Sequence, residues 1–99
     1  MIRKEIDPES DVVRVTFELP PMTWADTIHL VGEFNQWNRT SLPMARRRDD
    51  ENWHLTIDLP RGREYQFRYL INGTDWYNDW DADRHVPNPF GGDNSVVVV

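Results

Sequence analysis

Residues 53–73 read WHLTIDLPRGREYQFRYLING and carry the most regular hydropathy pattern in the chain. Apolar side chains occupy every second position in residues 53–59, and the alternation returns in residues 65–71 after an interruption at Pro60-Arg61-Gly62. This period is typical of a β-strand with one buried face. Asn72-Gly73 follows, and this dipeptide is the one most favoured in tight hairpin turns. The segment therefore predicts two strands and a hairpin turn.

Similar alternation extends to both sides of this segment. It occurs in residues 13–19, which end at Pro20-Pro21 because proline cannot donate to a strand ladder, and again in residues 28–34. Residues 42–48 predict a short edge strand, although the signal is weak because Pro43 interrupts it. The β-branched residues 95–99 predict a last strand, either buried on both faces or paired at an edge. Six or seven short strands without a helical period predict an all-β protein, an antiparallel β-sandwich.

The length of 99 residues suits one domain, because a split would leave two pieces too small to hold a core. Residues 1–11 are polar and contain a proline, so we expect a loose N-terminal lead-in followed by a sandwich domain over residues 12–99. Residues 78–94 have no hydropathy period and are rich in proline and glycine. Long loops of this kind are often functional.

The composition disfavours several classes of partner. The net charge of −6 would repel the phosphates of a nucleic acid. The longest apolar run is the four valines at residues 96–99, and residues 1–7 lack the apolar segment of a signal peptide, so we expect neither a membrane partner nor export. The absence of cysteine removes disulfides and thiol nucleophiles and agrees with a reducing cytosol. We therefore expect a cytoplasmic protein.

No pattern in the sequence points to catalysis. Residues 79–83 have the alternating aspartates that open a calcium loop, but Arg84 replaces its glycine and Phe90 its bidentate glutamate, which favours a solvated acidic turn. The three histidines lack the spacing of metal ligands. Nothing singles out a carboxylate pair for glycoside hydrolysis, a nucleophile elbow or a phosphate loop. We therefore expect no enzyme activity, no cofactor and no metal.

The aromatic residues are the unusual feature. Trp53 and Phe67 fit the buried stripes, whereas Trp37 lies in an Asn-rich turn and Trp76 lies just beyond the hairpin turn, out of phase with any stripe. Such tryptophans either plug the end of a sandwich or form a platform that stacks on the C–H face of a pyranose, while polar groups bind its hydroxyls. Nearby side chains of the right type are Asn35, Gln36, Asn38, Arg68 and Asn94.

Three blocks of the sequence carry a resemblance to a known family. They are GEFNQWN at residues 32–38, FRYLING at residues 67–73 followed closely by Trp76, and FGGDNSV at residues 90–96. Together they resemble carbohydrate-binding module family 48, the glycogen- and starch-binding domain of the β subunit of AMP-activated protein kinase and of isoamylase-type debranching and branching enzymes. The likeness spans residues 12–99. It implies an early-set, immunoglobulin-like sandwich.

The resemblance also implies a role for particular residues. Trp37 and Trp76 match the two stacking tryptophans of the kinase-subunit form. Arg68 stands where that form has a lysine that hydrogen-bonds the glucan, and Phe90 stands where a loop leucine contacts the sugar chain. Asn94 matches an asparagine that contacts a sugar hydroxyl.

The sequence departs from that form at three places. Gly92 replaces a threonine, which removes one hydroxyl contact. Thr74-Asp75 lengthens the turn before Trp76 by one residue, and the acidic run around Trp80-Asp81 differs from the loop of the kinase subunit.

The resulting prediction is a non-catalytic module that binds α-1,4-linked glucan, such as glycogen, starch or maltooligosaccharide. The predicted contacts are Trp37, Trp76, Arg68, Phe90, Asn94 and either Gln36 or Asn35. The alternative is a protein-interaction or scaffolding domain of the same fold, whose aromatic patch contacts a partner kinase or glycan-modifying enzyme.

Overall fold

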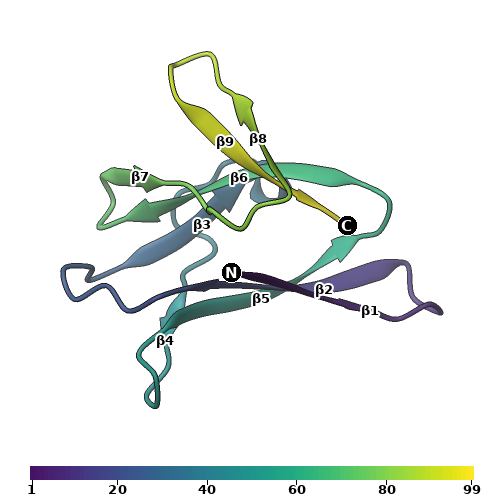
Figure 1. Ribbon diagram of the computed structural model, residues 1–99, viewed down its shortest axis with the longest axis horizontal. Coiled ribbons are helices and arrows are strands. Elements are labelled where there is room, and N and C mark those ends of the chain that lie inside the picture. The colour runs from purple at the N-terminus through teal and green to yellow at the C-terminus, as the bar shows by residue number, and fades with distance from the viewer.

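The computed structural model describes residues 1–99 as two antiparallel sheets packed face to face (Figure 1). The first sheet has the order β1-β2-β5-β4, with β1 at Ile2–Ile6, β2 at Val12–Leu19, β4 at Ala45–Arg46 and β5 at Trp53–Pro60. The second has the order β3-β6-β9-β8, with β3 at Ile28–Gly32, β6 at Glu64–Ile71, β8 at Arg84–Pro87 and β9 at Asp93–Val98. The short strand β7, Asp75–Tyr77, also pairs with β6, and Glu33–Asn35 form a 3-10 turn.

The core lies between the inner faces of the two sheets. Phe17 of β2 contacts Phe67 of β6 edge to face, with ring centroids 5.1 Å apart, and Phe67 contacts Tyr69 in the same way at 5.7 Å. All three rings are fully buried, and Trp53 is 5% exposed. Aromatic pairs of this geometry stabilise a core beyond the area they bury. The predicted β-sandwich and the predicted core positions of Trp53 and Phe67 are therefore confirmed.

The strands predicted by alternation are present as β2, β3, β5 and β6, and the weak signal in residues 42–48 corresponds to the two-residue edge strand β4. The predicted hairpin turn is also present, because β6 pairs with β7 across Asn72-Gly73-Thr74. Strand β9 lies between β6 and β8 and buries residues 94–97 on both faces. The count of six or seven strands is too low, however, because nine strands form. The strand β8 lies inside the segment that was expected to be one long loop.

The expected loose lead-in is wrong for residues 2–6, which form β1. This strand pairs with β2 over five residues, and most of its side chains are exposed. Arg3 contacts Glu18 at 3.1 Å, and Lys4 contacts Asp83, which directly precedes β8 of the second sheet, at 2.7 Å. Backbone pairing and charged contacts thus hold an edge strand that hydropathy does not reveal. The structure contains no helix with the length and apolar character that a membrane span requires.

Candidate functional site

The outer face of the second sheet presents polar and aromatic side chains. Because side chains alternate along a strand, Gln66 and Arg68 of β6 point away from the core that holds Phe67 and Tyr69. Strand β9 pairs with residues 64–67 and β7 with residues 69–71 of the same strand, so both lie along one edge of β6. Arg68 is therefore at the gap between β7 and β9.

An apolar floor lies on this outer face. Val31, Leu70 and Val96 are at most 2% exposed, yet they are not part of the core cluster between the sheets. Val31 pairs across the strands with Arg68, and Leu70 pairs with Trp76. Side chains directly opposite each other on neighbouring strands are in contact distance. Trp76 therefore lies over the outer face, out of the core, as its position in the sequence suggested.

A groove of about 770 Å³ opens on this outer face. It is bordered by the 3-10 turn after β3, by the outer face of β6 and β7, and by the loop between β8 and β9, whose hairpin extends beyond the sheet at the top of Figure 1. The lining residues are Glu33, Trp37, Arg39, Gln66, Arg68, Trp76, Asn88, Pro89, Phe90, Gly91 and Asn94. The structure thus brings together five of the seven residues proposed from the sequence: Trp37, Arg68, Trp76, Phe90 and Asn94.

The turn that carries Trp37 is held by Asn35. The side-chain oxygen of Asn35 accepts the Gly32 N–H at 3.0 Å, and its amide nitrogen donates to the carbonyl of Asn38 and to Oγ of Ser41, each at 3.0 Å. Trp37 itself donates its N–H to the Gly32 carbonyl at 2.8 Å and has a φ of 58°. This network fixes a left-handed backbone that non-glycine residues seldom adopt. Its effect is to place Trp37 at the groove.

Gly32 is required where β3 enters this turn. A Cβ atom there would lie 2.7 Å from the Gln66 carbonyl oxygen and 2.8 Å from the Phe67 Cβ, closer than such atoms approach in folded proteins. The turn can therefore pack against β6 only with glycine at this position.

Asn35 and Gln36 do not line the groove. The side chain of Asn35 is engaged inside the turn, so its role in the structure is to hold that turn. Gln36 occupies the left-handed position at the end of the 3-10 turn, with a φ of 55°. Other amides line the groove.

Those amides are Gln66, Asn88 and Asn94. Asn94 is only 9% exposed and donates its amide to Gln66 Oε1 at 3.0 Å, while Asn88 lies 3.4 Å from the Asn94 oxygen. Gln66 and Asn88 were missed by the sequence argument, although Gln66 precedes Arg68 by two residues and so shares its face. Each amide keeps a donor or acceptor free for a ligand.

Trp37 and Trp76 are 38% and 36% exposed. The guanidinium carbons of Arg39 and Arg68 each lie 5.5 Å from the centroid of the Trp76 ring, a cation–π distance. That distance exceeds direct stacking contact of about 3.5–4 Å, so neither group stacks directly on the centre of the ring. Nε of Arg68 is buried and has no hydrogen-bond partner.

Phe90 stands at the tip of the loop between β8 and β9 and is 95% exposed. Asn88 holds this loop, because its side-chain oxygen accepts the Phe90 N–H at 2.9 Å and its own N–H donates to the Gly92 carbonyl at 3.1 Å. Gly91 and Gly92 have φ values of 89° and 79°. These left-handed angles favour glycine over a β-branched residue, which gives a physical reason for glycine at position 92.

The expectation of a solvated acidic turn is wrong at Asp79, which is 2% exposed. Its carboxylate accepts a 2.6 Å hydrogen bond from the Tyr69 hydroxyl and a 2.8 Å bond from the Asp81 N–H. Burial, together with the Asp79 carboxylate, raises the pKa of Tyr69 well above its usual value of 10. No cluster of three or more His, Cys, Asp or Glu residues has an arrangement that could hold a metal ion. Trp80 is 82% exposed and lies outside the groove.

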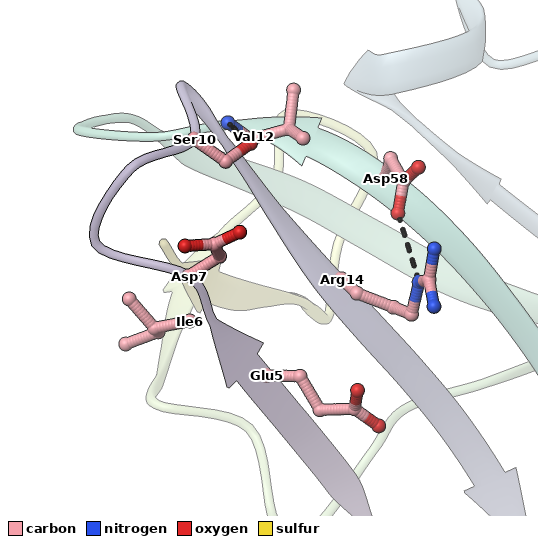
Figure 2. A pocket seen from close by; sticks show the side chains of 7 residues that line it. All are labelled: Glu5, Ile6, Asp7, Ser10, Val12, Arg14 and Asp58. Carbon is pink, nitrogen blue, oxygen red and sulfur yellow. Dashed lines mark hydrogen bonds and ion pairs between the residues drawn. The ribbon is translucent and has the colours of Figure 1, made fainter.

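A second concavity, of about 310 Å³, lies at the turn between β1 and β2 (Figure 2). Its polar lining includes Glu5, Asp7 and Asp58, and Asp58 accepts a 3.4 Å contact from Nε of Arg14. No aromatic residue lines it. The groove with the tryptophans is therefore the candidate binding site.

Residues 22–90 match the family model described as carbohydrate-binding module 48 (isoamylase N-terminal domain). The matched range holds every lining residue of the groove except Gly91 and Asn94. Over 80 residues the chain is 31% identical to the 1,4-alpha-glucan branching enzyme of Aquifex aeolicus (strain VF5). That alignment covers 78% of this chain but only 12% of the enzyme.

Proposed function

Because this chain belongs to the carbohydrate-binding module 48 family, we propose that its groove binds α-1,4-linked glucan, such as glycogen, starch or a maltooligosaccharide. The observation that carries the proposal is that Trp37, in the turn after β3, and Trp76, in strand β7, line one groove. Both indoles remain more than one-third exposed, although exposing a large aromatic ring to water is unfavourable. A bound pyranose would cover them.

The chemistry of the lining fits a sugar chain. The flat C–H faces of successive glucose units would stack on Trp37 and Trp76, and the exposed Phe90 ring would contact the chain from the loop between β8 and β9. Arg68 supplies hydrogen-bond donors, and Gln66 and Asn94 supply amides for the hydroxyl groups. In this arrangement apolar contact provides most of the affinity, and the polar groups orient the ligand.

We infer that the domain binds glucan without cleaving it. Glycoside hydrolysis requires two carboxylates on either side of the scissile bond. The groove has one carboxylate, Glu33, and its Oε1 accepts the Gln66 N–H at 2.6 Å. The module would then hold glucan for an enzyme, either in the same polypeptide or as a partner. The branching-enzyme relative, of which this chain spans 12%, supports that arrangement.

The test is electrophoresis of the purified chain in native gels with and without glycogen. Retardation by glycogen, relieved by added maltoheptaose in the absence of any other protein, is the expected result. A bovine serum albumin lane controls for sieving by the polymer. If glycogen does not retard the chain, the glucan proposal fails and the protein-interaction alternative, with a kinase or glycan-modifying enzyme as partner, takes its place.

A further inference from the structure

The groove holds two positive charges that the rest of the chain leaves unpaired. Elsewhere, the cationic side chains paired with carboxylates are Arg3, Lys4, Arg14, Arg47 and Arg84. Arg39 and Arg68 form no ion pair and no hydrogen bond, and Nε of Arg68 is buried without a partner. Other arginines also form no ion pair, namely Arg46, Arg48, Arg61 and Arg63, but none of them lines the groove.

Both groups lie beside the Trp76 ring. Each guanidinium carbon lies 5.5 Å from the Trp76 centroid, so the two carbons are separated by at most twice that distance. The only carboxylate lining the groove, Glu33, is engaged by the Gln66 N–H. The groove therefore carries an excess of positive charge beside the ring on which a sugar would stack.

On this basis, and resting on the proposed glucan binding, we propose that the site prefers α-glucan that carries a phosphate monoester. A phosphate monoester has a charge of about −1.5 to −2 and three strong acceptor oxygens. Arginine binds such a group through paired N–H donors, with bonds about twice as strong as those between neutral groups. A phosphoryl group on a glucose unit stacked at Trp76 would lie within reach of both guanidinium groups. A neutral hydroxyl would accept weaker hydrogen bonds from these guanidinium groups.

The test compares one pool of dextrins before and after phosphatase treatment. Dextrins prepared from phosphorylated amylopectin would be titrated calorimetrically against the chain at low ionic strength. We expect the phosphorylated pool to bind about tenfold more tightly than the treated pool, as charge-assisted hydrogen bonds imply. The ratio should shrink towards one in about 1 M salt, because salt screens exposed charges. Equal affinity of the two pools at low salt would overturn the inference.

Variants assign the effect to the groove. Arg39→Gln should reduce the affinity ratio of the two pools to threefold or less. Arg48→Gln removes the same charge at the turn between β4 and β5, outside the groove, and should leave the ratio unchanged. A ratio that fell equally in both variants would show a general charge effect and contradict the assignment.

Three further outcomes separate this inference from the proposed function. If glucose 6-phosphate alone binds as tightly as the phosphorylated dextrin, the ligand is a free sugar phosphate and the assignment to glucan is wrong. If the treated dextrin binds but phosphate adds nothing, the phosphate preference fails and glucan binding stands. If no dextrin binds in either form, the proposed function itself fails.

Discussion

The hydroxyl of Tyr69 donates a 2.6 Å hydrogen bond to the buried carboxylate of Asp79, and this contact joins the core to the loop that follows β7. The backbone N–H of Asp79 donates in turn to Oγ of Ser95 on β9 at 2.9 Å. A carboxylate that is 2% exposed is costly unless such partners satisfy it. This small network fixes the segment between β7 and β8. Strand β7 carries Trp76, and the loop after β8 carries Asn88 and Phe90, so the segment connects two walls of the groove.

Tyr69→Phe should lower the free energy of unfolding by about 1.5–3 kcal/mol, because it leaves part of the buried Asp79 carboxylate unsatisfied. Urea denaturation monitored by tryptophan fluorescence measures the loss. Tyr77→Phe is the matched control, since Tyr77 is 37% exposed. An equal effect of the two changes would show that the Tyr69–Asp79 bond adds nothing to stability.

The stability should also fall in acid through Glu18. Asn52 donates to its Oε1 at 2.9 Å, and Arg47 and Arg3 contact its oxygens at 3.0 and 3.1 Å. The Asn52 hydrogen bond, with these cations, lowers the pKa of Glu18 below its usual value of 4.5. A carboxyl whose pKa is lower in the folded state stabilises the fold above pH 4.5 and loses that contribution as the pH falls through its folded value.

Glu18→Gln should therefore reduce stability at pH 7 and flatten its decline as the pH falls below 4.5. Denaturant unfolding across that range measures both effects. Glu5→Gln, on the exposed strand β1, is the control. A Glu18→Gln variant with the same pH profile as the unchanged chain would show that Glu18 does not contribute to the loss of stability in acid.

Trp53 tests the assignment of core and site. It is 5% exposed and has the Arg46 guanidinium carbon 5.0 Å from its ring centroid. Trp53→Ala should cost about 3–5 kcal/mol through lost burial and a cavity, enough to unfold a domain of this size. Trp80→Ala, at an 82% exposed position, should change stability little. A normal thermal melt of Trp53→Ala with lost sugar binding would reverse the assignment.

Gly92 tests whether the threonine of the kinase-subunit form can be placed in this chain. Because φ is 79° at this position, Gly92→Thr should strain the loop between β8 and β9 by about 1–3 kcal/mol and weaken glucan binding. Gly92→Asn should be tolerated better, since asparagine adopts left-handed angles more readily. Tighter binding by Gly92→Thr than by the unchanged chain would mean that the loop differs when glucan is bound.

The sequence was sufficient to predict the central strands and the outward position of Arg68, because both follow from a period of two along β6. The edge strand β1 was missed, since its stability comes from backbone pairing and from contacts such as Lys4 with Asp83, across 79 positions. Burial of Asp79 was missed for a related reason. Its partners Tyr69 and Ser95 lie on other strands.

The groove was predicted in part. The likeness of short blocks to a known family selected Trp37 and Trp76, whereas alternation showed only that they were not in a core stripe. Arg39 and Asn88 reach the groove through the folding of the turn after β3 and of the loop between β8 and β9, which no local pattern specifies. Asn35 had the right chemistry for a sugar, but the turn requires its hydrogen bonds.

The two tryptophans carry the central claim, and calorimetric titration of maltoheptaose tests it most directly. An open groove should bind this ligand with a Kd on the order of micromolar to millimolar. Trp37→Ala and Trp76→Ala should each weaken binding by about 1.5–3 kcal/mol, roughly ten- to a hundredfold, and remain folded in thermal melts run beside the Trp80→Ala control. Arg68→Ala should cost less, about 1 kcal/mol. Unchanged affinity in both tryptophan variants would contradict the account and end the glucan-platform proposal.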